Sequence, residues 1–154
     1  MPKSLLDSNI LLEHFRRMPD KNAKGADDAK TWADLLIKNR GTNAIVSPVE
    51  IEVLAGTRDP HDLELTEAFL SRFEVVDGQR TLPEDWEMAK RFAKRVVKLD
   101  RQVPRQHRRR DRQDNPGTPA RQLGDCLISA IARRLNYSLI TADKRLIQQE
   151  GRTS

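Results

Sequence analysis

The spacing of apolar residues predicts a chain in which helices alternate with short strands. After residue 124, the apolar positions recur at the 3.6-residue period of a helix, at Leu127, Ile128, Ile131, Ala132 and Leu135. Asn136 can adopt the left-handed conformation that ends a helix. Residues 137–141 form a short stretch of mainly apolar or β-branched residues, which is typical of a core strand.

The same alternation fills the rest of the chain. Strands are predicted at residues 4–6, 44–46 and 73–76, and helices at residues 10–15, 26–40, 47–56, 63–72 and 86–99. Gly41 ends the second of these helices, and Ser47, Pro48 and Glu50 predict a capping box with proline at the first helical position. Strands that alternate with helices imply an α/β fold with a mostly parallel sheet, covered by helices on both faces. Residues 1–154 are expected to form a single domain.

Acidic residues from separate segments are predicted to meet at one edge of that sheet. Asp7 and Asp143 follow strands at their carboxyl ends, where open α/β sheets place their sites. Glu50 is assigned to the capping box, and Glu52 lies about 200° from it around the helix, so Glu52 is the residue predicted to face the site. Asp125 is placed in the first turn of its helix, at the same edge. Any one of these residues could be only a cap or turn former, as Asp7 could be for the first helix.

A gathering of acidic side chains is best explained by a bound cation. Carboxylates repel each other, and burial raises their pKa values, whereas Mg²⁺ or Mn²⁺ binds oxygen ligands and removes the conflict. Such a metal can polarise a phosphodiester and activate a water molecule. The histidines His14, His61 and His107 show no zinc-ligand spacing, and the sequence has no Gly-rich phosphate loop. The pattern therefore favours metal-dependent hydrolysis of a phosphodiester.

Positive charge is concentrated in one part of the chain. The 154 residues carry 28 Lys or Arg and 23 Asp or Glu, a net charge of +5, and the excess lies on the helix at 86–99 and in the polar segment at about 100–120. A solvated helix face and a self-repelling surface loop are the plain alternatives, but a basic helix that leads into a basic loop favours phosphate binding. The residues predicted to bind the phosphates of an anionic partner are Lys90, Lys94, Arg95, Arg105, Arg108, Arg109, Arg110 and Arg112.

No apolar run in the sequence is long enough to span a bilayer, and the N-terminus lacks the core of a signal peptide. Cys126 is the single cysteine and cannot form an internal disulfide. A cytoplasmic location is therefore expected, with no membrane association.

Three stretches of the sequence, taken together, carry a family resemblance. They are LLDSNILL at residues 5–12, SPVEIEVLAG at residues 47–56 and GDCLISAIARRLNYSLITADKRL at residues 124–146. In this order, and covering nearly the whole chain, they resemble the PIN domain family and, within it, the VapC-type toxins of bacterial and archaeal toxin–antitoxin pairs. The resemblance implies a three-layer α/β/α sandwich, Mg²⁺ or Mn²⁺ in an acidic pocket, and ribonuclease activity. The family's acids match Asp7, Glu52, Asp125 and Asp143, and its small polar residues nearby match Ser8, Asn9 and Thr141.

The expected function is therefore a metal-dependent endoribonuclease of the toxin type. The resemblance also implies a homodimer and a cognate antitoxin protein, whose tail would cover the mouth of the basic pocket. Two features depart from the family pattern: the arginine-rich insert at 100–120 is longer than expected, and Leu146 occupies a position that is often aromatic. Two alternatives stay open, a non-catalytic PIN-like nucleic-acid-binding or regulatory module and a structure-specific DNA nuclease.

Overall fold

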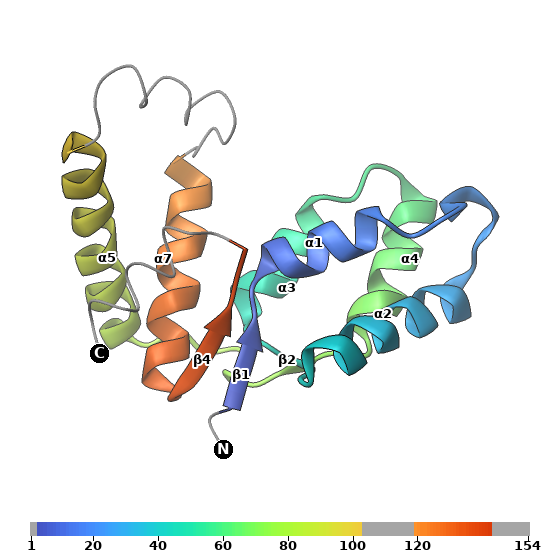
Figure 1. Cartoon of the computed structure of the whole chain (residues 1–154), viewed down its shortest axis with the longest axis horizontal. Helices are drawn as coiled ribbons and strands as arrows, with labels where there is room; N and C mark the ends of the chain where they lie inside the picture. The colour runs from blue at the N-terminus through green and yellow to red at the C-terminus, as the bar shows by residue number, and fades with distance from the viewer. Residues whose placement is uncertain (1–2, 103–118, 143–154) are drawn as a thin grey trace.

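The computed structural model describes residues 3–102 and 119–142 of the chain (Figure 1). In chain order the elements are β1 (Lys3–Leu6), α1 (Ser8–Arg16), a 3₁₀ turn (Lys21–Ala23), α2 (Ala26–Arg40), β2 (Ala44–Ile45), α3 (Ser47–Ala55), α4 (Pro60–Leu70), β3 (Glu74–Val75), α5 (Pro83–Gln102), α7 (Pro119–Arg134) and β4 (Tyr137–Ile140).

The strands form two parallel pairs in the middle of the molecule. β1 pairs with β4, with Leu6 opposite Ile140, and β2 pairs with β3. The two pairs lie beside each other, and the Thr42 hydroxyl near β2 donates a hydrogen bond of 2.7 Å to the Ser4 carbonyl on β1. Parallel strands connected through helices confirm the predicted α/β fold.

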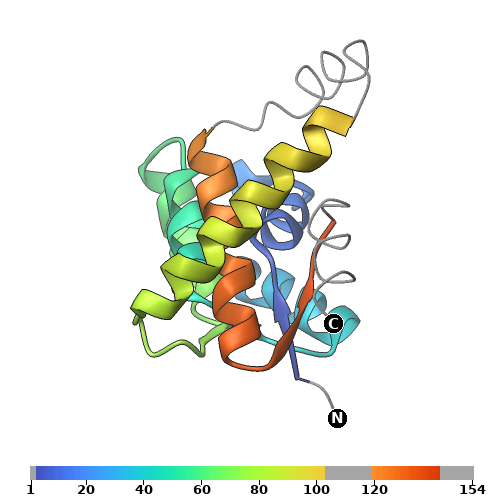
Figure 2. The same cartoon turned by 90° about the vertical axis from the view of Figure 1, so that its left-hand side faces the viewer.

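Helices cover the strands from two sides. α5 and α7 pack side by side on one side of β1 and β4, and α1 to α4 lie on the other (Figures 1 and 2). The core between them is apolar and includes side chains with no exposed surface, among them Leu5, Leu6, Leu11, Ile45, Val49, Phe69, Ile128 and Ile131. Among the described helices, none has the length and apolar character needed to cross a membrane.

A reciprocal pair of hydrogen bonds fixes α1 against α2. The Nε2 atom of His14 donates to the Trp32 carbonyl at 2.6 Å, and the Trp32 indole donates to the His14 carbonyl at 2.7 Å. The two rings also stack, with their centroids 4.5 Å apart. These contacts hold α1 in a fixed orientation against α2. Because α1 follows β1 directly, they also orient the helix that begins next to Asp7.

The start of α7 differs from the prediction. The helix begins at Pro119, so Gly124 and Asp125 lie in its interior and Asp125 is not in the first turn. Glycine weakens a helix interior, so the sequence around Gly124 gives little indication that the helix continues through it. Pro119 is compatible with the first turn, where its missing N–H has no partner to lose. The helix thus extends into the segment that was expected to be a loop from 100 to 120, and α5 extends into it from the other side, as far as Gln102.

The start of α3 also differs. The backbone N–H of Ser47 donates to Asp77 Oδ2 at 2.9 Å and its hydroxyl donates to Asp77 Oδ1 at 2.7 Å, so Asp77 fills the role that the capping box gave to Glu50. Asp77 is buried and comes from the loop after β3. A local sequence motif could not reveal a cap from 30 residues away. Downstream, α4 begins at Pro60, three residues before the predicted start at residue 63.

Candidate active site

Asp7 lies at the carboxyl end of β1 and is completely buried. Its Oδ1 atom accepts a hydrogen bond of 2.8 Å from the backbone N–H of Ser8, which makes Asp7 the N-cap of α1. Its Oδ2 atom accepts a bond of 2.7 Å from the hydroxyl of Thr141, which follows β4. The backbone N–H of Asp7 donates to the Ile140 carbonyl at 3.0 Å. The capping alternative is thus correct, and the same carboxylate also joins the ends of two parallel strands.

Glu52 projects from α3 towards α7. A Cβ atom added to Gly124 would overlap the Oε1 atom of Glu52 and would lie 3.0 Å from its carboxyl carbon. The Glu52 carboxylate therefore rests against the α7 backbone, one residue from Asp125. The reason given for choosing Glu52 over Glu50 was wrong, because Glu50 is not the cap of α3. Glu52 is nevertheless the glutamate of α3 that reaches the neighbourhood of Asp125.

Asp125 is half-buried in the second turn of α7. Its charge acts on the next residue: burial, and to a lesser degree the Asp125 carboxylate, raises the pKa of the Cys126 thiol to about 11. Cys126 is therefore a neutral, buried side chain at physiological pH, as expected of a packing residue. The negative charge of Asp125 lies on the same part of α7 as the Glu52 contact.

The structure leaves part of the predicted site undescribed. Asp143 and the arginines from Arg105 to Arg112 lie outside the described residues. Within residues 3–102 and 119–142, no group of three or more His, Cys, Asp or Glu side chains is arranged to hold a metal ion. That the four acids bind one cation together stays a prediction, since one of the four is not in the described part.

The donor set is chemically suited to a hard divalent cation. Asp7, Glu52 and Asp125 offer only carboxylate oxygens, the ligands that Mg²⁺ and Mn²⁺ prefer. Two of them are fixed by the fold, Asp7 through its hydrogen bonds and Glu52 through its contact with α7. The chemistry of these three side chains therefore fits the predicted metal, while the described residues alone do not form a group arranged to hold it.

The other predicted residues lie near Asp7 or on α5. Ser8 is buried in the first turn of α1 and Asn9 is half-buried beside it. Lys90, Lys94 and Arg95 are exposed on α5. This face is not purely basic, because Lys90 pairs with Glu87 at 3.0 Å, and that hydrogen bond, followed by the charges of Lys90 and its neighbours, lowers the pKa of the Glu87 carboxyl.

Sequence reasoning missed two residues that shape the site. Asp77 sets the start of α3 and hence the position of Glu52, and Gly124 provides the space into which the Glu52 carboxylate fits. The sequence shows that residue 124 is a glycine but not which group lies beside it, because Glu52 is distant along the chain. For Asp77 there was no local signal.

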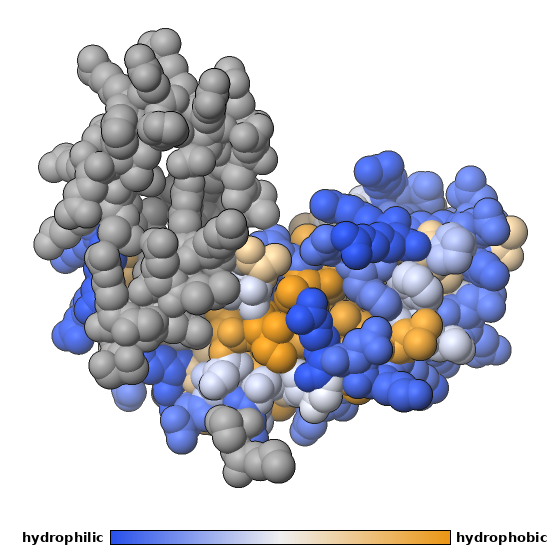
Figure 3. Space-filling view, viewed as in Figure 1, coloured by the Kyte–Doolittle hydropathy of each residue, from blue (hydrophilic) through white to orange (hydrophobic). Residues whose placement is uncertain are grey.

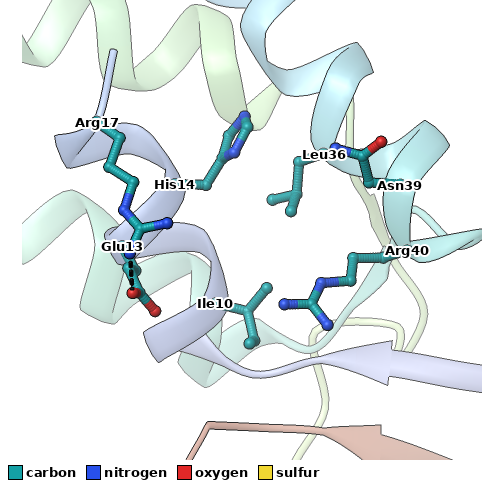
Figure 4. Close-up of a pocket in the computed structure, with 7 residues that line it drawn as sticks. All are labelled: Ile10, Glu13, His14, Arg17, Leu36, Asn39 and Arg40. Carbon is teal, nitrogen blue, oxygen red and sulfur yellow. Dashed lines mark hydrogen bonds and ion pairs between the residues drawn. The ribbon is translucent and has the colours of Figure 1, made fainter.

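A separate hollow of about 310 Å³ lies between α1 and α2 (Figure 4). On the face seen in Figure 1, apolar side chains reach the surface near the middle of the molecule, and hydrophilic side chains cover α1 and α2 beside them (Figure 3). An ion pair of 2.6 Å between Glu13 and Arg17 lies at its rim. None of the predicted acids lines this hollow, whose walls are Ile10, Glu13, His14, Arg17, Leu36, Asn39 and Arg40.

Comparison with known proteins identifies the family. The model of the PIN domain matches residues 4–151, nearly the whole chain. No curated protein and no solved structure matches the chain. The family match agrees with the α/β fold and its parallel strands. The chain therefore belongs to the PIN domain family, whose members are generally metal-dependent nucleases.

Proposed function

We propose that this protein is an Mg²⁺- or Mn²⁺-dependent endoribonuclease and the toxin of a toxin–antitoxin pair. The four acids Asp7, Glu52, Asp125 and Asp143 hold the metal in this proposal. The observation that carries it is the contact of the Glu52 carboxylate with the α7 backbone, next to Asp125. This contact supports the proposal because the acid of α3 lies against the residue that precedes Asp125, in a chain of a nuclease family.

A cation explains why the fold gathers these acids. Two carboxylates on adjacent helices repel each other, and in a partly buried setting water screens that repulsion less than it does at the surface. In the proposal, Glu52 on α3 and Asp125 on α7 supply such a pair of carboxylates to the metal. A divalent metal converts the repulsion into a shared attraction, so the arrangement is favourable once the metal is bound.

The residues around Asp7 fix the geometry that the reaction needs. The Ser8 N–H and the Thr141 hydroxyl each donate to a different oxygen of Asp7, which leaves the carboxylate one orientation. Such supporting hydrogen bonds orient metal ligands and change metal affinity when they are lost. When bound, the metal would act as a Lewis acid on the phosphodiester and activate water. Asn9 is proposed to support the same acids.

Exposed basic residues on α5 are proposed to contact the RNA backbone. Lys90, Lys94 and Arg95 lie on the helix that leads towards the arginine-rich segment, whose own role stays a prediction. Each phosphate contact that is lost reduces the salt dependence of binding. RNA binding measured over a series of salt concentrations, with the inactive Asp125→Asn protein, therefore reports whether these residues take part.

The toxin role and its partners rest on the resemblance to VapC-type proteins. A homodimer and a protein antitoxin are part of the proposal, and a small neighbouring gene for a DNA-binding protein would support it. A cytoplasmic location belongs to the same proposal.

The experiment that tests the function compares substrates and metals. Single-stranded RNA, folded RNA and flap DNA are incubated with the protein in Mg²⁺, in Mn²⁺ and with a chelator. We expect metal-dependent cleavage of RNA, and Asp7→Asn or Asp125→Asn should reduce the rate by about 100-fold or more because each removes a metal ligand. Asp27→Asn, at an exposed position on α2, is the matched control and should cleave as the wild type does.

Each alternative predicts a different result. Cleavage of flap DNA with intact RNA would indicate the DNA nuclease, and RNA binding without cleavage in either metal would indicate a non-catalytic module. Thermal unfolding of each variant separates loss of the site from loss of the fold. Full activity of Asp125→Asn would show that the site is assigned to the wrong residues.

A further inference from the structure

Gly124 occupies a position where the helix itself does not require glycine. It lies inside α7, the sixth residue of a helix that begins at Pro119. Its φ angle is not among the positive values in the described chain, so an alanine could adopt the same backbone. Glycine weakens a helix interior relative to alanine because its backbone loses more freedom on folding. The reason for glycine here must lie in what surrounds it.

The space beside Gly124 is filled by one group. The three atoms nearest to an added Cβ all belong to the carboxyl group of Glu52: Oε1 would overlap the Cβ, the carboxyl carbon would be 3.0 Å away and Oε2 would be 3.8 Å away. Because Gly124 has no side chain, the Glu52 carboxylate can lie directly against the backbone of α7.

The other glycines in the described part of the chain show no such contact. A Cβ added to Gly56 would meet only ordinary neighbours, the nearest being the Val53 carbonyl oxygen at 3.5 Å. Gly25, Gly41 and Gly78 have nothing within 4 Å. The tight approach is therefore specific to Gly124, the residue that precedes Asp125.

We propose that Gly124 is a positioning residue for the metal site, whose lack of a side chain sets the position of the Glu52 carboxylate relative to Asp125. This inference rests on the proposed metal-dependent function. The blocking atoms are at the far end of a flexible side chain, so the fold can accept an alanine by rotating Glu52 away. The substitution should therefore move the acid without breaking the helix.

Stability and metal affinity should respond in opposite directions. In Gly124→Ala the melting temperature stays the same or rises, because alanine favours the helix. The dissociation constant for Mn²⁺, measured by calorimetry, rises about tenfold, because the displaced carboxylate no longer reaches the shared ion in the same geometry. A purely structural glycine would instead lower the melting temperature.

Gly56→Ala is the matched control. It makes the same chemical change at the end of α3, where the added methyl group would meet its neighbours at ordinary van der Waals distances. The Mn²⁺ dissociation constant should stay within about twofold of the wild-type value. Adding Glu52→Asp to Gly124→Ala should recover part of the affinity lost, because the shorter side chain leaves room for the new methyl group. Wild-type affinity in Gly124→Ala would overturn the proposal.

A metal-free readout separates this inference from the proposed function. The ¹³C chemical shift of the Glu52 carboxyl carbon, assigned with Glu52→Gln, should change in Gly124→Ala and not in Gly56→Ala. If the wild type binds no Mn²⁺, the proposed function fails, and this shift then decides whether Gly124 positions Glu52. An unchanged shift in Gly124→Ala overturns the positioning role whatever the protein binds.

Discussion

Acidic side chains lie against α7 in two different settings, one towards each end of the helix. At its C-terminal end, Arg134 Nε lies 2.8 Å from Asp85 Oδ1 on α5, and the Asp85 side chain is only 1% exposed. The second oxygen of Asp85 accepts from the backbone N–H of Leu82, and Arg134 also donates to the Arg80 carbonyl at 3.3 Å. Here a buried acid has a basic partner and its hydrogen bonds are satisfied within the protein.

Nearer its N-terminal end, α7 meets another acid. The carboxylate of Glu52 rests against Gly124, and Asp125 adds a charge of the same sign. The comparison shows that burial of a carboxylate does not by itself mark a functional site. Asp85 is as buried as Asp7, but its basic partner indicates a structural role. If the predicted acids do meet beside Gly124, a bound cation would stabilise them there.

The largest effect is expected at the structural end of α7. Arg134→Met leaves Asp85 buried beside an apolar side chain, and the free energy of unfolding should fall by about 3 kcal/mol. The Arg134 side chain is 21% exposed, which places the effect at the low end for a buried pair. Urea denaturation measures it, and RNA cleavage per folded molecule should not change.

Arg133→Met is the control for this prediction, because Arg133 is the exposed neighbour on the same helix. It should change the unfolding free energy by less than about 0.5 kcal/mol. Equal stability of the two variants would show that the Asp85–Arg134 ion pair does not hold α7.

A smaller effect is expected from pH at the acidic end. The pKa of the Cys126 thiol is about 11 in the folded chain against 9.0 as the ordinary value. Between pH 9 and pH 11 the thiol loses its proton in the unfolded chain and keeps it in the folded chain. The free energy of unfolding is therefore unaffected by this group below pH 9 and falls as the pH rises towards 11. The loss from this group is about 2 kcal/mol.

Comparison with Cys126→Ala isolates this contribution, because lysines and the tyrosine titrate alike in both proteins. The wild type should lose more stability than the variant as the pH rises above 9 in urea denaturation. Parallel loss in the two proteins would show that the thiol does not sense its burial or Asp125.

The features that sequence predicted well depend on local signals. The helix Ala26–Arg40 has the predicted bounds, and Gly41 ends it with a φ of 73°. Asn136 has a φ of 60°, as expected of the residue that ends α7. Both residues tolerate the left-handed conformation, so the information lies within a few positions of the helix end. The parallel pairing of strands followed in the same way from their alternation with helices.

The features that were missed depend on contacts between distant residues. The capping box at Ser47 was a valid local pattern, but Asp77 forms a cap from another loop and displaces Glu50. Asp125 was predicted in the first turn of its helix, whereas α7 begins at Pro119 and continues through Gly124, a residue that weakens helices. The use of Gly124 is visible only when α3 is placed beside α7.

Mn²⁺ binding by calorimetry tests the central claim most directly, in the wild type, in Glu52→Gln, in Asp125→Asn and in the double variant. If the two acids share one ion, each single change weakens binding about tenfold or more, and the double change costs less than the sum of the two. Wild-type affinity in both single variants, or strictly additive losses, would contradict a common metal held between α3 and α7.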